Sequence, residues 1–506
     1  MMTKRLILLI SLSIATVSSF SSVSLSRRQR QHRHGTTRSS KYANDTGESN
    51  DQLGAWIPLG SASSLTGLGP QRIKVCGVDL VVWHSHIDGK EEKKKTSTSY
   101  VWSAAIDACT HRLAPLSQGR VNPETSCIEC PYHGWQFDSK GHVCSIPQLE
   151  NNKSLSSVAK SGGNLQTFPI HLAGDLLFVF LPSSIHNEMF PQSLLPEDYY
   201  PYLAEDKLLI EKQPIFVRDL PYSFDFLVEN FMDPAHIPFA HHKLQSTRSD
   251  GKPIEMTEIV SNFTHVEATF KDETRGRARD AYASFQRPSF YHYGEFEEGK
   301  RSPKLKIFLA PIESGKSRVF LYAMTNKFPT FLLHAGSNRF LNSDSWLHDT
   351  EREVVRRKEA GLAEKKLANM DYMYATKSDL GVSLFRKWWL ANGMAHSPPH
   401  TFSMAAMRDL PASALLRSQQ IDPWENHSKH CSHCRNSLKK LKLGQAICLL
   451  LAFANPVLIR GQPVVAIAGT GLFLFARNFL KKTATVIEGN SERSLIGDRS
   501  SAAIAD

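Results

Sequence analysis

The chain has 506 residues, a formal net charge of +11 and eight cysteines. Residues 1–44 carry eight Lys/Arg and no Asp or Glu, so they account for +8 of this charge and the remainder is nearly balanced. We therefore expect no basic nucleic-acid-binding face and no nucleic-acid partner. Eight cysteines in so long a chain do not indicate a disulfide scaffold, and the length suits two or three domains.

The pattern of the N-terminal segment indicates a targeting sequence. Lys4 and Arg5 precede an apolar run from Leu6 to Val17, the pattern of a secretory signal. A Ser/Arg/His-rich stretch without acidic residues follows and looks like a plastid transit peptide. We interpret residues 1–50 as a bipartite presequence that resembles those of diatoms and related algae, with simple secretion as the alternative. The expected location is a complex plastid.

Two cysteine–histidine pairs stand in loops rich in glycine, proline and polar residues: Cys109-Thr-His111 and Cys130-Pro-Tyr-His133. Two thiolates on one iron and two imidazoles on the other give the Rieske form of a [2Fe–2S] cluster. A zinc site uses the same ligand types, but it usually keeps its cysteines together and its histidines together. The mixed order resembles the cluster-binding loops of Rieske proteins. We expect these four residues to bind a Rieske cluster.

A second metal motif follows about a hundred residues later, where Asp233, His236 and His241 have the spacing D-x₂-H-x₄-H. On a helix the two histidines lie somewhat over one turn apart, and a break at Pro238 could turn both imidazoles toward one metal. Two histidines and a carboxylate form the facial triad of non-haem Fe(II) oxygenases. The segment resembles the iron-binding helix of Rieske non-haem oxygenases. A helix with surface histidines is the alternative.

The third ligand is expected from residues 342–351, where the family carries its ligand carboxylate. We favour Asp344; Asp349 and Glu351 are alternatives, and a merely solvated helix face is a further one.

Asp233 and Asn230 are the expected catalytic residues of the iron motif. Asp233 precedes the first histidine by three residues, so it can hydrogen-bond a ligand imidazole. The family resemblance implies that Asp233 also carries the electron from a Rieske histidine of a neighbouring subunit. It therefore implies a homotrimer with head-to-tail contacts.

The C-terminal region contains two uncharged runs, Leu443–Ile459 and Gly461–Ala476, each near the lower limit of roughly 17 residues for a spanning helix. Lys and Arg flank the pair on both outer sides, which predicts a transmembrane hairpin; a buried or re-entrant helix pair is the alternative. Cys431-Ser-His-Cys434 precedes it and could be half a zinc site, a redox dithiol or a surface disulfide. Because no second cysteine pair follows, we favour a redox-regulatory dithiol open to a thioredoxin-like partner.

The pattern of apolar segments predicts an α+β chain. Short strands before residue 182 indicate an antiparallel β Rieske domain, and alternating segments between Ser261 and Asn326 indicate a twisted antiparallel sheet. A helical stretch is expected from Asn342 to Asn369, and the whole resembles the helix-grip catalytic domain of the family. The expected divisions are a presequence 1–50, a Rieske domain 51–182, a linker 183–206, a catalytic iron domain 207–411, a CxxC-containing linker 412–442, a transmembrane hairpin 443–482 and a disordered tail 483–506.

In combination these motifs resemble the plastid Rieske oxygenases grouped with pheophorbide a oxygenase and the translocon-associated Rieske protein, from about Trp56 to Lys482. The resemblance implies a mono-oxygenase with a Rieske [2Fe–2S] cluster and mononuclear non-haem Fe(II). It would take electrons from reduced ferredoxin and use O₂ on a chlorophyll-derived tetrapyrrole, with opening of the pheophorbide a macrocycle as the favoured reaction. Alternatives are hydroxylation of chlorophyllide or protochlorophyllide, or redox sensing in plastid protein import. The catalytic domains would face the stroma from the inner envelope or thylakoid.

Overall fold

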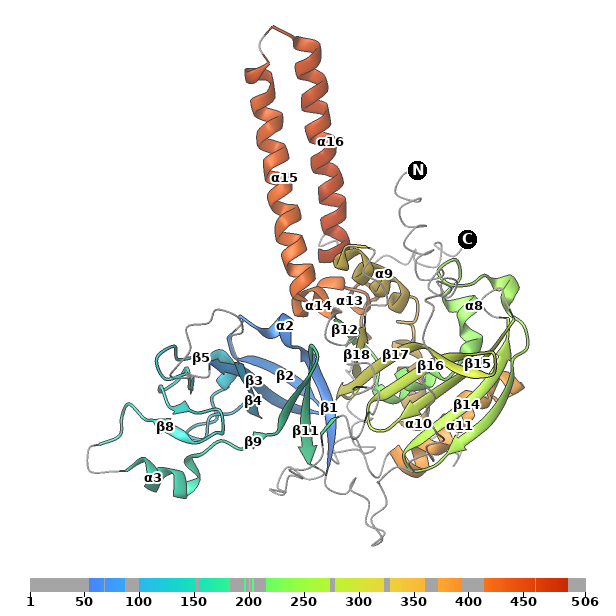
Figure 1. Ribbon diagram of the computed structural model, residues 1–506, viewed down its shortest axis with the longest axis horizontal. Helices are drawn as coiled ribbons and strands as arrows, with labels where there is room; N and C mark the ends of the chain where they lie inside the picture. Colours follow the sequence, from blue (N-terminus) through green and yellow to red (C-terminus); the bar gives the residue numbers. More distant parts are fainter. Residues whose placement is uncertain are drawn as a thin grey trace, which may run out of the picture.

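The computed structural model describes residues 54–67, 69–86, 100–150, 154–182, 195–196, 200, 203, 215–273, 278–322, 328–359, 372–393, 414–459 and 461–489. The predicted presequence and C-terminal tail beyond residue 489 lie outside these ranges, as does most of the predicted linker 183–206. The described part is an α+β structure of antiparallel sheets, helices and a long helical hairpin (Figure 1), which confirms the predicted fold class.

The N-terminal domain is built from three small antiparallel sheets, as the short alternating segments predict. Their strands are β1 (Gly54–Ser61), β11 (Leu176–Pro182) and β10 (Ile170–Ala173) in the first sheet; β2 (Gln71–Val75), β3 (Val78–His86), β4 (Tyr100–Ile106) and β9 (Thr167–Phe168) in the second; and β5 (Arg120–Val121), β6 (Ile128–Glu129), β7 (Gln136–Phe137) and β8 (Val143–Ser145) in the third. Two short helices, α2 (Ala62–Leu65) and α3 (Leu155–Val158), complete it.

The second domain contains a seven-stranded antiparallel sheet with the order β12-β18-β17-β16-β15-β14-β13. The strands are β12 (Ile215–Leu220), β13 (Glu255–Ser261), β14 (His265–Asp272), β15 (Arg279–Gln286), β16 (Phe290–Glu297), β17 (Lys300–Glu313) and β18 (Lys316–Tyr322), and the helices are α7 (Phe224–Phe231), α8 (Ile237–Ala240), α9 (Thr330–Asn342), α10 (Leu347–Glu359) and α11 (Leu380–Trp388). The helical stretch expected from Asn342 starts too early: α9 ends at Asn342, Asp344 lies in the turn that follows, and α10 begins only at Leu347.

Alternating side chains give this sheet two apolar faces. Phe290 and Phe308 pack into one core with Trp56 of β1 and Phe178 of β11. Their chain neighbours on β16 and β17 point the other way, into a second core with α7 and α11. The outer face of the large sheet therefore holds the N-terminal domain, while its inner face holds the helices that carry the iron motif.

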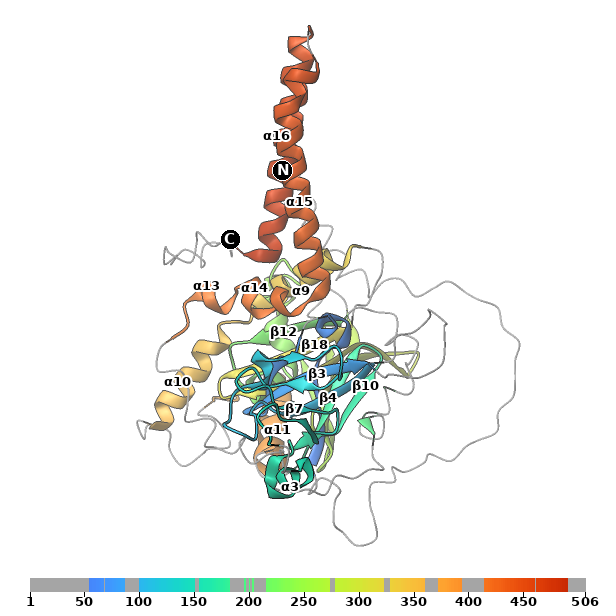
Figure 2. The ribbon, with the colours of Figure 1, turned by 90° about the vertical axis from the view of Figure 1, so that its left-hand side faces the viewer.

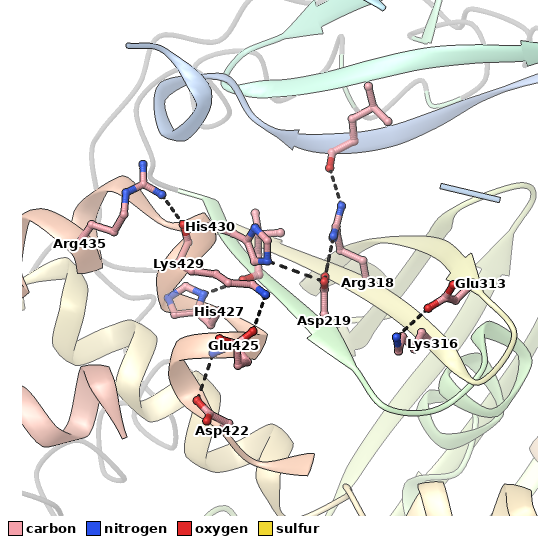
Figure 3. A network of polar contacts seen from close by, with 12 residues as sticks. Asp219, Glu313, Lys316, Arg318, Asp422, Glu425, His427, Lys429, His430 and Arg435 are labelled. Atoms are coloured by element: carbon pink, nitrogen blue, oxygen red, sulfur yellow. Dashed lines mark hydrogen bonds and ion pairs between the residues drawn. The ribbon is translucent and has the colours of Figure 1, made fainter. Parts of the chain in front are cut away.

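A polar network continues this junction toward the C-terminal segment. Arg318 of β18 donates through Nη2 to the Asp219 carboxylate of β12, at 2.9 Å, and through Nη1 to the Leu59 carbonyl of β1, at 3.3 Å. Figure 3 shows His430 beside the same Asp219 carboxylate. Strands from both domains and the segment before the hairpin thus meet at one arginine–aspartate pair.

The C-terminal segment forms α13 (Arg417–Gln420), α14 (Pro423–Asn426) and two long helices, α15 (Ser432–Leu458) and α16 (Pro463–Glu488). The long helices lie side by side and project away from the β domains in both views (Figure 1, Figure 2), and both are long and apolar enough to cross a membrane. They are longer than the predicted runs because each continues toward the protein body. In particular, α15 begins directly after Cys431, so the CxxC motif occupies its first turn.

The iron-motif helix α7 is fastened to α11 by a buried ion cluster. Arg386 of α11 pairs through Nη1 with the Asp225 carboxylate at 2.5 Å and also with Glu229, both on α7. The Arg386 and Asp225 side chains are almost completely buried. Loss of the arginine would leave two carboxylates in the interior without their counter-charge.

We expect Arg386→Ala to lower the free energy of unfolding by about 3–5 kcal/mol, because it breaks a buried ion pair from one side. Urea unfolding of the detergent-solubilised protein, followed by circular dichroism, measures this change. Arg356→Ala is the control, since Arg356 pairs with Glu353 on an exposed helix face and should leave the unfolding curve unchanged. Equal unfolding curves for both variants would contradict the prediction.

Candidate metal centres

The two cluster motifs occupy turns with the same backbone design. In each turn the cysteine N–H donates to the carbonyl five residues later, and the N–H four residues later donates back to the cysteine carbonyl. These bonds are Cys109 to Ala114 at 2.8 Å, Leu113 to Cys109 at 2.8 Å, Cys130 to Trp135 at 2.8 Å and Gly134 to Cys130 at 3.1 Å. Leu113 and Gly134 both take a left-handed φ, 59° and 73°, which closes each turn.

The paired turns bring the four predicted cluster residues together in pairs of like chemistry. Cys109 and Cys130 are both buried and lie within one hydrophobic core. The His111 and His133 rings approach to 4.6 Å between centroids, and Trp135 stacks on His111 at 4.8 Å. Two thiols and two imidazoles are thus presented as separate pairs, which is what a cluster with differently ligated irons requires.

Two further observations fit a bound cluster. The His111 Nδ1 atom is buried and has no protein hydrogen-bond partner. Burial raises the pKa of the Cys109 thiol to about 11, so a nearby cation is needed to hold this sulfur as a thiolate at neutral pH. The donor set therefore matches a Rieske cluster in both chemistry and arrangement.

The second centre brings His236, His241 and Asp344 together, with their ligand atoms within 4.8 Å of one another. The two Nε2 atoms are 3.2 Å apart, and the His241 Nε2 lies 3.4 Å from the Asp344 Oδ2. Nitrogens about 2.1 Å from a common ion at adjacent octahedral positions would be about 3 Å apart. The three side chains therefore present one face of ligands to a single point.

The backbone around Asp233 explains this convergence. α7 ends at Phe231, and Asp233 has an extended conformation before a 3-10 turn over Pro234–His236. Its carboxylate caps that turn by accepting from the Ala235 N–H at 2.8 Å. The predicted break therefore exists, but it precedes His236 rather than lying at Pro238, which is accommodated in the first turn of α8.

Both histidines of this centre are held in the tautomer that a metal needs. The His236 Nδ1 donates to the Asp233 backbone carbonyl at 2.5 Å, whereas the Asp233 carboxylate is 3.7 Å away. The His241 Nδ1 donates to the Ser343 hydroxyl at 2.7 Å, because that hydroxyl itself donates to the Phe340 carbonyl. The two Nε2 atoms therefore point toward each other, 3.2 Å apart, as two ligands of one ion would.

Asp344 is an uncommonly buried carboxylate, with 2% of its surface exposed. Asn230 donates to its Oδ2 at 3.3 Å, while its Oδ1 has no hydrogen-bond partner. Burial raises the pKa of this carboxyl to about 6, although the nearby His236 acts to lower it. An ion between the three ligands would supply the missing positive charge.

The alternative carboxylates lie elsewhere. Glu351 is buried and accepts from the Ser223 backbone N–H at 2.8 Å, and Asp349 is exposed on α10. Sequence analysis did not single out Ser343, which orients His241, or Phe340, whose ring stacks on His241 at 3.8 Å. Only their position ahead of Asp344 could have suggested a role.

A third cluster surrounds the CxxC motif. Cys431 and Cys434 are buried, and their sulfurs lie with ring nitrogens of His334 and His427 within 4.8 Å of one another. Neither histidine was predicted. His427 stands only four residues before Cys431, but nothing in the local sequence points to His334, almost a hundred residues upstream.

Comparison with known proteins identifies a Rieske domain and relatives that include a named oxygenase. A Rieske [2Fe–2S] domain model matches residues 55–169. The chain is 26% identical over 450 residues to a chloroplastic pheophorbide a oxygenase of Oryza sativa subsp. japonica, covering 82% of this chain and 79% of the relative. It is 27% identical over 462 residues to the chloroplastic protochlorophyllide-dependent translocon component 52 of Arabidopsis thaliana, covering 78% and 75%. A crystal structure of dicamba monooxygenase bound to 3,6 dichlorosalicylic acid has 17% identity and a TM-score of 0.48, over 66% of this chain and 96% of that one.

The Rieske domain and the His–His–carboxylate centre define the class of the protein, which is a Rieske non-haem iron oxygenase with a [2Fe–2S] cluster and a mononuclear iron. Within this class the chain is similar to the plastid group that was expected from its motifs. The predicted enzyme class and cofactors are thereby confirmed.

Asp344→Ala should remove the mononuclear iron and leave the Rieske cluster intact, because the substitution deletes one ligand of that centre only. Iron analysis and the electron paramagnetic resonance signal of the reduced cluster check the two halves of this prediction. Asp349→Ala, on the exposed face of α10, is the matched control and should keep all iron. Full iron content in Asp344→Ala would exclude this carboxylate as a ligand.

Ser343→Ala should weaken Fe(II) binding by about 10–100-fold, because it removes the group that orients His241 without touching the metal. The dissociation constant is measured by titrating Fe(II) anaerobically into protein stripped of its mononuclear iron. Ser337→Ala on the same helix is the control, since its hydroxyl donates to the Leu333 carbonyl. Unchanged affinity in Ser343→Ala would show that the helix alone orients the imidazole.

Proposed function

We propose that the chain is a ferredoxin-dependent mono-oxygenase of a chlorophyll-derived tetrapyrrole, and that its reaction is the opening of the pheophorbide a macrocycle. The observation that carries this proposal is the presence of both metal centres in a chain similar to pheophorbide a oxygenase over 82% of its length. Similarity to the protochlorophyllide-dependent translocon component supports the same class of pigment.

In this proposal Cys109, His111, Cys130 and His133 hold the Rieske cluster, which accepts single electrons. The two imidazoles are not fully buried and Tyr132 beside them is 60% exposed, so the histidine side of the cluster is the side that a redox partner can approach. Cys109 and Cys130 are buried, so the cysteine side of the cluster would be shielded from solvent. Reduced ferredoxin is the proposed donor.

His236, His241 and Asp344 hold the mononuclear iron, which supplies O₂ activation when bound. Asn230 keeps the Asp344 carboxylate in place through its amide hydrogen bond. The Asp233 carbonyl fixes the His236 ring, which leaves the Asp233 carboxylate, 29% exposed, available to a group outside this chain.

The placement of the two centres supports a head-to-tail homotrimer. In Figure 1 the strands β5 and β8, which belong to the same domain as the cluster turns, lie at one side of the molecule and α8, between the iron-site histidines, at the other. An electron would then reach the iron from the cluster of a neighbouring subunit, and the exposed Asp233 carboxylate is the proposed bridge to it.

The helices α15 and α16 are proposed to anchor the enzyme in a plastid membrane. Their apolar side chains, among them Leu450, Phe453 and Phe475, are largely exposed in the described part of the chain. Apolar area of this kind is stable in lipid rather than in water. The catalytic domains would then lie on the stromal side of the inner envelope or thylakoid, next to a membrane that dissolves apolar pigments.

The reaction is tested with purified protein carrying both metals, reduced ferredoxin and ¹⁸O₂, offered pheophorbide a, chlorophyllide a and protochlorophyllide a separately. We expect a ring-opened product with one labelled oxygen from pheophorbide a alone. His236→Ala should abolish this product and keep a reducible cluster. A labelled hydroxymethyl or formyl product from another pigment would make the chain a biosynthetic hydroxylase, and no product from any pigment would favour a redox-sensing role in protein import.

A further inference from the structure

The cluster around the CxxC motif joins parts of the chain that are remote in sequence. His334 comes from α9, His427 follows α14, Cys431 caps α15 and Cys434 lies in its first turn. All four side chains are at most 2% exposed. This centre shares no residue with the cluster turns or the iron-site ligands, and the proposed oxygenase reaction assigns it no role.

The distances within the cluster match the edges of a metal tetrahedron. The His334 Nδ1 lies 3.4 Å from the Cys431 sulfur and 3.6 Å from the Cys434 sulfur, and the His427 Nε2 lies 3.3 Å from the Cys434 sulfur. Zinc bonds of about 2.3 Å to sulfur and about 2.05 Å to nitrogen give a sulfur–nitrogen edge of about 3.5 Å at tetrahedral angles. The three measured contacts lie close to this value.

His427 is held as a metal ligand would be. Its Nδ1 lies 2.6 Å from the Val217 carbonyl, which can only accept, so this nitrogen carries the proton. The Nε2 lone pair then points toward the Cys434 sulfur, and Phe216 stacks on the ring at 4.5 Å. In zinc sites a ligand imidazole usually binds the metal through one ring nitrogen and donates the N–H of the other nitrogen to a carbonyl or carboxylate.

His334 supplies a second, independent indication. Its Nδ1 is nearly equidistant from the two sulfurs, whereas one N–H can make a good hydrogen bond to only one of them. Its Nε2 is buried without a hydrogen-bond partner, so only the side that faces the sulfurs can compensate for burying the ring. A shared cation between the sulfurs and Nδ1 provides that compensation.

We propose that His334, His427, Cys431 and Cys434 form a structural zinc site that fastens the C-terminal hairpin to the catalytic domain. Zinc suits a closed set of two thiolates and two imidazoles, and binding it releases the two thiol protons. A dithiol that serves a thioredoxin-like partner must be reachable by that partner, and these two cysteines are each only 2% exposed. The sequence has no second cysteine pair to complete a zinc site. Two histidines take the place of that pair.

The surrounding contacts show what such a site would hold in place. Ser432, between the two cysteines, donates through its backbone N–H to the Ser64 hydroxyl of α2 at 3.1 Å. Arg435 donates to the Ser64 carbonyl at 2.8 Å and to the Lys429 carbonyl at 2.6 Å (Figure 3). The first turn of α15 therefore contacts the N-terminal domain while its cysteines face the catalytic domain.

The test is the metal content of the full-length protein purified in detergent under reducing conditions. We expect about one zinc ion per chain, with about two sulfur and two nitrogen neighbours at the distances above in zinc-edge X-ray absorption. Cys434→Ser should lose the zinc, whereas Cys448→Ser, on the same helix but outside the cluster, should keep it. Asp344→Ala should also keep it, which separates this site from the iron centre.

Three results would overturn the proposal. One is a zinc-free protein in which mass spectrometry after alkylation finds Cys431 and Cys434 joined as a disulfide. Another is a tetrahedral site of the same ligands filled with iron, and the third is zinc that Asp344→Ala removes. If Cys434→Ser does not fold, the zinc-edge X-ray absorption spectrum of the unaltered protein still shows whether zinc is bound by two sulfur and two nitrogen ligands.

Discussion

The position of the iron centre depends on a buried arginine. Arg218 of β12 is 1% exposed, and its guanidinium donates to the Asn338 carbonyl at 2.7 Å and to the Asn342 side chain at 2.6 Å. Burial lowers the pKa of Arg218 to about 10, which still leaves it charged at neutral pH. The cation thereby fixes the C-terminal turn of α9 on the sheet, where a positive charge also favours the helix dipole. Asp344 follows immediately.

The same strand organises the CxxC cluster. Val217 precedes Arg218 on β12, and its carbonyl is the acceptor that fixes His427. Helix α9 carries His334 near its start and leads to Asp344 beyond its end. Two consecutive residues of one strand and one helix therefore position ligands of both centres. A change that loosens α9 from β12 would therefore disturb both sites at once. The buried polar contacts between β12 and α9 stabilise both centres.

Sequence reasoning singled out side chains that the structure brings together where the ligands are close in sequence, and it missed side chains that are brought together only by folding. The cluster motifs and the H-x₄-H spacing each place their ligands within a few residues, so residue types and spacing alone indicated them. The charged run after Asn342 was predicted to be helical, so the turn that places Asp344 between α9 and α10 was not anticipated. His334 and Ser343 acquire their roles only through contacts with distant segments. No local pattern records such contacts.

Hydrogen bonding, rather than burial, separates ligand histidines from core histidines in this protein. His348 is as buried as His241, but both of its nitrogens are satisfied by the backbone: Nδ1 donates to the Pro221 carbonyl at 2.7 Å, and Nε2 accepts from the Leu415 N–H at 3.2 Å. In His241 and His427 the Nδ1 atom is bound to an oxygen, and the Nε2 atom faces other metal-binding groups. An imidazole with one committed nitrogen beside thiols or carboxylates is incomplete without a cation. By this criterion His427 resembles the iron-site histidines, which supports the proposed zinc site.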